Sequence, residues 1–157
     1  MRLPVRVYAD TSVYGGLCDT EFAFGSAAFF RGVEAARYHL VTLAAVAREI
    51  SGAPPEVQET SAEWLDAAEL TPLSGEALDL QQACLEAAIV GPRGDTDALH
   101  VALATVARCR VIVSWNFRHI VSPSKIPLDN AVNVVRGYDP IAIYTPLEVI
   151  DDDDERA

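Results

Sequence analysis

The sequence predicts an α/β fold: a three-layer α/β/α sandwich whose central, mainly parallel sheet has helices on both faces. Short apolar segments rich in β-branched residues alternate with longer segments of helical character, which is typical of parallel sheets. Half of the 157 residues are hydrophobic, which is enough for a core without disulfides. We therefore expect a single domain at residues 1–150, followed by an acidic, disordered tail at residues 151–157.

The first half of the chain contains two predicted strands. The first covers residues 5–9 and runs directly into Asp10, and the second covers residues 39–43. Between them, residues 14–16 read as a loop and residues 21–37 as a helix rich in Ala and Phe. A short helix at residues 44–50 ends before the breaker Ser51-Gly52-Ala53-Pro54-Pro55, and Pro55 begins another helix that runs to about residue 68.

The second half begins with a helix at residues 74–89, for which Ser74 is the expected N-cap. After Gly91-Pro92-Arg93-Gly94, residues 95–107 form a helix that is apolar nearly all round and is therefore expected to be buried. A strand at residues 110–114 leads into Trp115-Asn116-Phe117, and residues 123–130 read as loop. Of the short apolar stretches 131–135 and 141–144, at least one should be a strand, and residues 145–148 suggest a final capped turn.

Composition excludes several classes of protein. No apolar run approaches the roughly 20 residues that span a bilayer, and the first residues lack a signal-peptide pattern. The three cysteines are widely spaced and fit no zinc or CxxC pattern, so we expect reduced, buried thiols and a cytoplasmic location. With a formal net charge of −11, the chain as a whole lacks the excess of basic residues that is usual for nucleic-acid binding.

Asp10 is the first candidate site residue. If the strand before it is central and parallel, its carboxyl end faces the crevice where α/β sheets bind ligands. The alternative is that Asp10 only caps a turn or helix, as Asp, Ser and Thr often do.

Two acids open the buried helix at residues 95–107. Asp95 suits the N-cap and Asp97 lies in the first turn, where the helix dipole favours an anion. One acid is sufficient for the cap, so the second invites another explanation. His100, three residues after Asp97, is expected to be a packed residue rather than a catalytic one.

In a parallel sheet, four side chains can converge at one edge. Asp10 follows the first strand, Glu49 lies in the helix after the second strand, Asp97 opens a late helix, and Asn116 follows the next strand. Three carboxylates brought together repel, and their pKa values rise unless a cation neutralises them. Oxygen ligands suit Mg²⁺ or Mn²⁺, which can polarise a phosphoryl oxygen and activate water for attack on a phosphodiester.

Four ordered motifs resemble those of the PIN-domain family over residues 5 to about 145. They are Tyr8-Ala9-Asp10-Thr11-Ser12, Ala47-Arg48-Glu49-Ile50, the run from Asp95 to Ala104, and Val113-Ser114-Trp115-Asn116-Phe117. The resemblance implies a Mg²⁺-dependent endoribonuclease, as in VapC-type toxins of toxin–antitoxin pairs, with RNA as substrate and an antitoxin as partner. It assigns Asp10, Glu49 and Asp97 as catalytic metal ligands, supported by Ser12 or Thr11. Asn116 also belongs to the implied catalytic set, but it stands where many members carry a fourth Asp, which puts the level of activity in doubt.

Two other functions compete with this one. A phosphatase of the haloacid-dehalogenase type also opens on a strand that ends in Asp, but it needs a second acid where this chain has Ser12. A catalytically weak or inactive PIN-like scaffold that acts through protein contacts is the second alternative, favoured by Asn116 and by the acidic charge and opposed by the three acids.

Possible contacts to partners are less specific. The basic candidates near the site are Arg93, Arg118, His119 and Lys125, which either steer phosphates or are ordinary surface charges. The segment from Phe22 to Phe30 carries aromatic residues on more than one helical face. We expect this segment to be buried on two sides, or to contribute to a homodimer or an antitoxin-binding groove.

Overall fold

A computed structural model describes residues 3–87, 95–118 and 120–149, and within them it contains a five-stranded, all-parallel sheet with strand order β3-β2-β1-β4-β5. The strands are β1 (Val5–Ala9), β2 (Tyr38–Leu43), β3 (Glu69–Thr71), β4 (Val111–Val113) and β5 (Ala142–Tyr144). In the central pairs, Val7 is in register with Leu40 of β2 and with Val111 of β4. The predicted parallel sheet is therefore confirmed.

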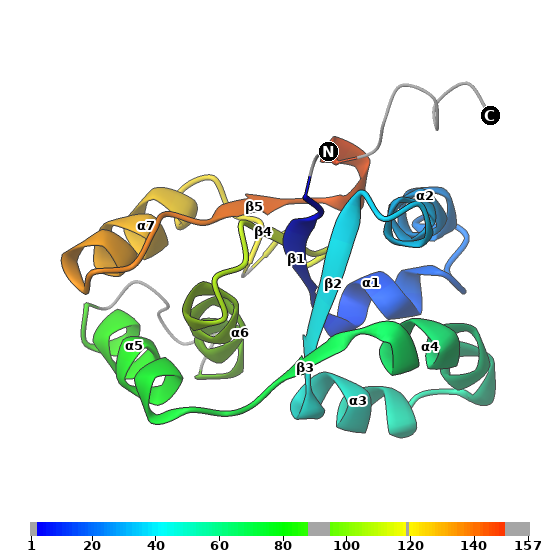
Figure 1. The fold of residues 1–157 in the computed structure, drawn as a ribbon, viewed down its shortest axis with the longest axis horizontal. Coiled ribbons are helices and arrows are strands. Elements are labelled where there is room, and N and C mark those ends of the chain that lie inside the picture. Colours follow the sequence, from blue (N-terminus) through cyan, green and yellow to red (C-terminus); the bar gives the residue numbers. More distant parts are fainter. Residues whose placement is uncertain (1–2, 88–94, 119, 150–157) are drawn as a thin grey trace.

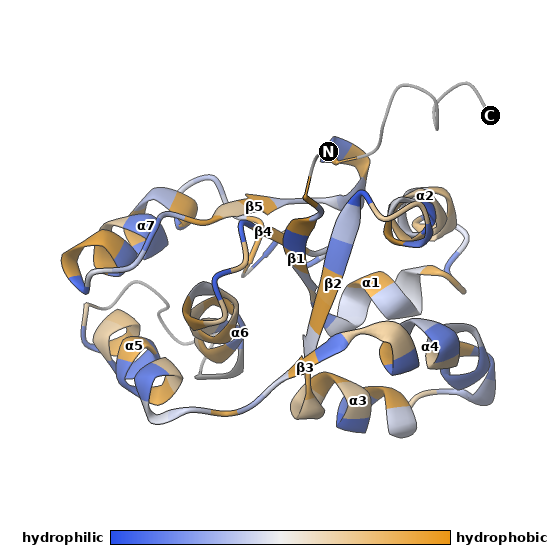
Figure 2. Cartoon of the chain, viewed as in Figure 1, coloured by the Kyte–Doolittle hydropathy of each residue, from blue (hydrophilic) through white to orange (hydrophobic). Residues whose placement is uncertain are grey.

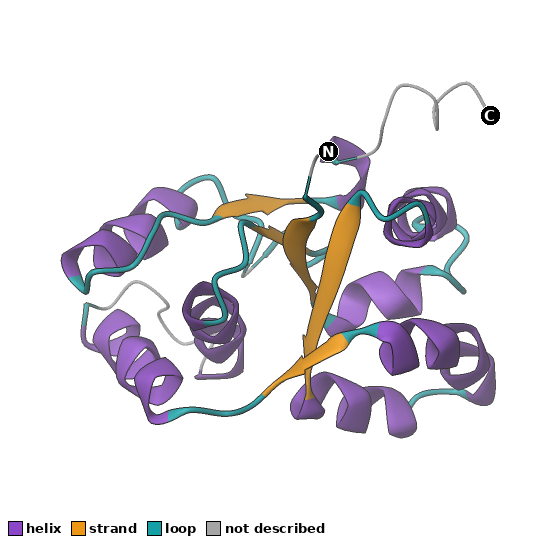
Figure 3. Cartoon of the chain, viewed as in Figure 1, coloured by secondary structure: helices purple, strands orange, loops and turns teal. Residues whose placement is uncertain are grey.

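Helices cover both faces of this sheet (Figure 1, Figure 3). They are α1 (Thr11–Gly16), α2 (Ala23–Glu34), α3 (Ala44–Ser51), α4 (Pro55–Ala67), α5 (Gly75–Glu86), α6 (Asp95–Val106) and α7 (Ile126–Val135), followed by the 3₁₀ helix η2 (Pro146–Glu148). Helices α1 to α4 lie on one face, and α5 to α7 lie on the other. Right-handed crossovers require this division, because the chain steps outward from β1 to β3 and then returns to add β4 and β5 on the other side. The predicted three-layer α/β/α sandwich is confirmed.

The core lies between the sheet and both helical layers. Tyr8 of β1, Phe29 and Phe30 of α2, Leu103 of α6 and Ile112 of β4 are fully buried. Helix α6 is apolar nearly all round, as the sequence predicts, whereas α4 carries long hydrophilic stretches (Figure 2). A helix without a polar face has to be buried, and α6 packs against both α5 and β4.

Three local expectations are wrong. Residues 14–16 belong to helix α1, because Tyr14 is buried and Gly16 lies close against α2. Residues 126–130, expected as loop, begin helix α7, which also includes residues 131–135. The expected loop contains Pro127, but Pro is compatible with the first turn of a helix and did not indicate a break. Strand β3 was missed because Glu69-Leu70-Thr71 is short and mostly exposed.

Other local expectations are confirmed. Ser74 caps α5, since its hydroxyl accepts a hydrogen bond of 3.1 Å from the Ala77 N–H. Thr145 and Glu148 form a capping box at η2, and residues 142–144 are a strand. The acidic tail lies outside the described residues.

No helix in the described ranges is long and apolar enough to cross a membrane. Cys18, Cys84 and Cys109 form no disulfide; Cys84 and Cys109 are buried, and Cys18 is half-buried.

Candidate active site at the carboxyl end of the sheet

The polar residues singled out in the sequence gather at the carboxyl ends of β1 and β4, the two neighbouring strands between which the chain changes the direction in which it adds strands. β1 leads on one side to β2 and β3, whereas β4 pairs with the other side of β1. Asp10 directly follows β1, and Ser114 and Asn116 follow β4. Ligands of open α/β sheets bind in the crevice at this kind of switch point, beyond the carboxyl ends of the strands.

Two serine hydroxyls hold the carboxylate of Asp10 from its two sides. Ser12 Oγ donates to Oδ1 at 2.5 Å, and Ser114 Oγ donates to Oδ2 at 2.9 Å. Each hydroxyl also accepts a backbone N–H at 2.9 Å, Ser12 from Trp115 and Ser114 from Asn116. The segment after β4 therefore fixes the orientation of an acid that belongs to β1.

Asp10 is only 6% exposed. Burial raises the pKa of Asp10 above its ordinary value of 3.8, while the hydrogen bonds from Ser12 and Ser114 lower it in part. Although Asp10 occupies the N-cap position of α1, its side chain makes no capping hydrogen bond. Capping alone therefore does not explain a buried acid at this position.

Glu49 reaches the same edge of the sheet from α3. Its Oε2 accepts a hydrogen bond of 2.5 Å from Thr11 Oγ1, and Thr11 is the residue next to Asp10. Glu49 is exposed, whereas Thr11 is half-buried. The threonine therefore links the surface acid of α3 to the start of α1.

Asp97 is joined to the site through Asn116. The Asn116 Nδ2 atom donates to Asp97 Oδ1 at 3.4 Å, and both residues are half-buried. Asn116 lies two residues after Ser114, whose hydroxyl it bonds through its backbone N–H. One hydrogen-bonded chain thus runs from Asp10 through Ser114 and Asn116 to Asp97.

The four predicted side chains occupy one edge of the sheet, but they do not form a ready-made metal cage. Within residues 3–87, 95–118 and 120–149, no three His, Cys, Asp or Glu side chains lie close enough together to hold a metal ion. The acids bond instead to hydroxyl and amide groups, namely Ser12 and Ser114, Thr11, and Asn116. The donor set of three carboxylates and an amide still has the chemistry that Mg²⁺ prefers, because each carboxylate oxygen keeps a further lone pair.

Ser114 is a site residue that reasoning from the sequence missed. The signal was its position, since it lies at the end of β4 and two residues before Asn116. His100 is buried, as expected for a packed residue, and its Nδ1 lies 2.6 Å from the hydroxyl of Tyr8. This pair lies beneath the site, because Tyr8 precedes Asp10 by two residues and His100 follows Asp97 by one helical turn.

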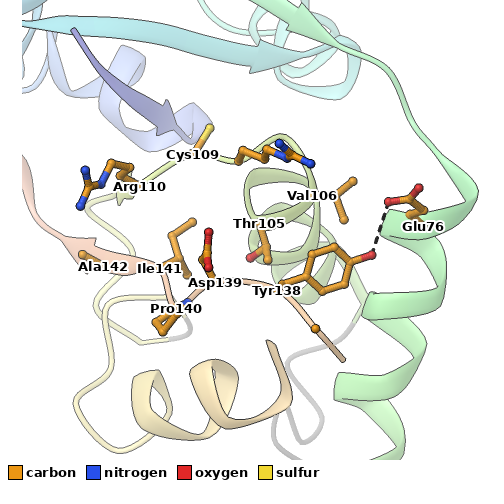
Figure 4. A pocket seen from close by; sticks show the side chains of 12 residues that line it. Glu76, Thr105, Val106, Cys109, Arg110, Tyr138, Asp139, Pro140, Ile141 and Ala142 are labelled. Atoms are coloured by element: carbon orange, nitrogen blue, oxygen red, sulfur yellow. Dashed lines mark hydrogen bonds between the residues drawn. The ribbon is translucent and has the colours of Figure 1, made fainter. Parts of the chain in front are cut away.

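The basic candidates differ in their placement. Arg118 is exposed and Lys125 is half-buried, whereas Arg93 and His119 lie outside the described residues. A separate cavity of about 1120 Å³ lies near the start of β5 and the end of α6 (Figure 4). It is lined by residues such as Thr105, Tyr138 and Asp139, and by none of the four predicted site residues.

The fold can be compared with known structures. The chain is similar to a chain in the crystal structure of VapBC2 from Rickettsia felis bound to a DNA fragment from their promoter, with a TM-score of 0.58 and 10% sequence identity. The similarity covers 90% of this chain and 98% of that one. The fold is PIN-like. No model of a protein family matches this sequence, and no curated protein matches it.

At this level of identity the similarity concerns the fold alone. The structure of this chain itself places the four motifs around the switch point of the sheet: after β1, in α3, from the start of α6, and at the end of β4. The assignment of a reaction depends on the chemistry of the side chains placed there.

Proposed function

We propose that this protein is a metal-dependent endoribonuclease whose catalytic residues are Asp10, Glu49, Asp97 and Asn116. The observation that carries the proposal is the buried Asp10 carboxylate, fixed by two serines at the switch point of the PIN-like sheet. Burying a charged carboxylate costs free energy, and a cation bound at that carboxylate would offset the cost. In a purely structural role, Asp10 would carry this cost with no cation to offset it.

Asp10, Glu49 and Asp97 are the residues that would hold Mg²⁺ or Mn²⁺. The bound ion supplies Lewis-acid polarisation of a phosphoryl oxygen and lowers the pKa of a water molecule. Asp10 is positioned by Ser12 and Ser114, while Thr11 and Asn116 hold Glu49 and Asp97 near the same edge. These four hydrogen bonds fix each acid at this edge of the sheet.

We further propose that the chain is the toxin of a toxin–antitoxin pair. Support comes from the motifs and from the similarity of the fold to VapBC2 of Rickettsia felis. An antitoxin that covers the switch point would control access of RNA to Asp10.

A second candidate function is a PIN-like scaffold without nuclease activity. It is favoured by the amide of Asn116, which donates to Asp97 and so occupies one of the proposed ligands. It is also favoured by the separation of the acids into hydroxyl-bonded and amide-bonded groups. In that case the buried Asp10 would serve only to join β1 to the segment after β4.

Cleavage of an end-labelled single-stranded RNA, with Mg²⁺ and with a chelator, tests the nuclease. Wild type should cleave only with metal. Asp10→Asn should cleave at least on the order of 100-fold more slowly, because an ion at such a site stabilises the transition state by several kcal/mol. Asp66→Asn, an exposed acid of α4, is the matched control and should cleave like wild type. Equal cleavage by wild type and Asp10→Asn would rule the proposed site out and favour the scaffold.

A further inference from the structure

An aromatic cluster lies directly beside the proposed catalytic residues, with Trp115 at its centre. The Trp115 ring stacks on Phe22, with ring centroids 4.5 Å apart and an interplanar angle of 26°. Its Nε1 donates to Ser26 Oγ at 2.9 Å, and its backbone N–H donates to Ser12 Oγ at 2.9 Å. Trp115 is only 7% exposed, so it is fixed both to the core and to the serine that holds Asp10.

Phe117 extends this cluster into solvent. Its ring centroid lies 6.3 Å from that of Trp115, and its side chain is 54% exposed. The turn that carries it is fixed by backbone hydrogen bonds: Phe117 N–H donates to Trp115 O at 2.9 Å, and Val121 N–H donates to Asn116 O at 2.9 Å. The backbone that carries the exposed ring is therefore fixed next to Asn116 before any ligand arrives.

Arg118 follows Phe117 and is also exposed. Its guanidinium makes no hydrogen bond or ion pair with any residue in the described ranges. The chain as a whole carries a net charge of −11, so it cannot attract a polyanion by a general basic surface. Binding of a nucleic acid to such a chain has to depend on a local cation and on contacts that are not electrostatic.

We propose that Phe117 and Arg118 form a nucleotide subsite, in which the base of an unpaired nucleotide stacks on Phe117 while Arg118 binds its phosphate. This inference rests on the proposed ribonuclease function and adds the residues that select the substrate. Stacking on an aromatic side chain is available only to a base that has left a duplex. The subsite therefore selects a single strand over a duplex and positions the nucleotide next to Asn116 and the acids.

Binding without metal separates this subsite from catalysis. Fluorescence anisotropy of a labelled single-stranded oligoribonucleotide, measured with a chelator present, should show Phe117→Ala binding on the order of 10-fold or more weakly than wild type. Phe117→Tyr should restore the affinity, because its ring also stacks. The control is Val135→Ala, since Val135 at the end of α7 is an apolar side chain exposed at 83% that lies outside the aromatic cluster.

A base deletion tests stacking directly. Replacing single nucleotides of the oligonucleotide by abasic ones should find a position at which wild type loses affinity and Phe117→Ala loses nothing further. Arg118→Gln should lower the slope of log affinity against log salt by about one unit, as expected for one phosphate contact.

Three outcomes would overturn the subsite. One is unchanged RNA affinity in Phe117→Ala with an unchanged melting temperature. Another is an equal loss in Val135→Ala, which would indicate a nonspecific apolar surface. The third is a Phe117→Ala variant that changes the assembly on a sizing column but not RNA binding, which would make the ring a protein contact. If Phe117→Ala binds RNA normally while Asp10→Asn has lost cleavage, the subsite fails and the proposed nuclease stands; if wild type neither binds nor cleaves RNA, both fail.

Discussion

Asp10 is both buried and held in a fixed orientation. Its surroundings disfavour its charge, because it is buried, and yet both of its oxygens are held in fixed directions by Ser12 and Ser114. Each serine hydroxyl donates to Asp10 while it accepts a backbone N–H of the segment after β4, so the carboxylate is tied to that segment. A buried acid held in this way is suited to bind a cation in a constant geometry.

The burial of Asp10 makes a prediction about the dependence of stability on pH. Because its pKa is raised in the folded chain, the folded state binds a proton more tightly than the unfolded state. Below its ordinary pKa of 3.8, the carboxyl is protonated in both states and Asp10 does not destabilise the fold. As the pH rises from 3.8 through the folded-state pKa, the free energy of unfolding falls, because the unfolded chain releases the proton more readily. Asp10→Asn removes this dependence, so in chelator the variant should gain stability relative to wild type as pH rises from 3.8.

Denaturant unfolding of wild type and Asp10→Asn at several pH values measures this difference. A difference in the free energy of unfolding that stays constant across the pH range would show that the carboxyl titrates normally. Glu69, whose pKa is lowered to about 2 by Arg6 and His39, titrates in both proteins and cancels in the comparison.

Asn116 is the residue at which this chain departs from the pattern of the family it resembles. Its amide donates to Asp97, so Asn116→Asp places one carboxylate against another. Without metal, the variant should unfold about 1 kcal/mol more easily, through the lost hydrogen bond and the added repulsion. With Mg²⁺, the stabilisation by metal should be larger than in wild type, because the added charge faces the cation.

Thermal unfolding with and without Mg²⁺ decides the role of Asn116. If Asn116→Asp loses stability and responds to Mg²⁺ no better than wild type, the amide holds Asp97 for structural reasons only.

The sequence predicted Asp10, Glu49, Asp97 and Asn116 as one group, because two follow strands, one opens a helix and one lies in the short helix after a strand. All four could then be placed at one edge of a parallel sheet. It could not predict that the acids bond to Thr11, Ser114 and Asn116 rather than to one another. That pairing depends on side-chain rotamers and on the close contact between the ends of β1 and β4. Sequence separations of 38 and 104 residues carry no signal of such contacts.

At the scale of elements, helix α1 decides whether the site can form. It is six residues long and contains two glycines, so its sequence favours a loop. Tertiary contact overrides this preference: a Cβ atom added to Gly16 would lie 2.4 Å from Ser26 Oγ and 2.8 Å from Trp115 Nε1. Only glycine allows α1 to approach α2 and the segment after β4 this closely.

The two glycines of α1 therefore make a matched pair of variants. Gly16→Ala should lower the free energy of unfolding by about 1–3 kcal/mol, since it separates Trp115 from Ser26. Gly15→Ala meets no atom within 4 Å and should raise it by up to about 1 kcal/mol, because alanine favours a helix. Chemical denaturation of both variants tests the packing, and equal effects would contradict it.

The elements that the sequence predicted well are those with strong periodicity or a clear cap, such as α5 with its Ser74 cap and α6 with its apolar surface. Edge strand β3 and helix α7 were missed. β3 is held by its pairing with β2 and by Glu69, which forms an ion pair of 2.7 Å with Arg6 of β1. Such long-range contacts do not appear in a local pattern.

At the scale of the whole molecule, the net charge of −11 and the exposed apolar residues determine which partners this chain can bind. In α2, Phe29 and Phe30 are buried and only Phe24 is exposed. The expectation that this helix presents more than one apolar face to a partner is therefore limited to the surface around Phe24. Leu147 of η2 is exposed at 50%, and both it and Trp115 lie close to Gly25. An apolar surface on α2 and η2 is where we expect a second copy of the chain or an antitoxin to bind.

Phe24→Glu tests this surface. A charge at its centre should lower the apparent mass on a sizing column, or the affinity for an antitoxin encoded beside this chain, with the melting temperature unchanged. A wild-type chain that remains monomeric at high concentration and binds no such partner would leave this surface without the proposed role.

The central claim is that the acids at the switch point act together on one class of ligand, a divalent cation. Calorimetric titration of Mg²⁺ into wild type, Asp10→Asn, Glu49→Gln and Asp97→Asn tests it, with Asp66→Asn as the control for lost charge. We expect wild type and Asp66→Asn to bind alike, and each of the other three to bind on the order of 10-fold or more weakly, since each removes one charged oxygen ligand. Mg²⁺ affinity that is absent in wild type, or unchanged in Glu49→Gln and Asp97→Asn, would contradict the claim.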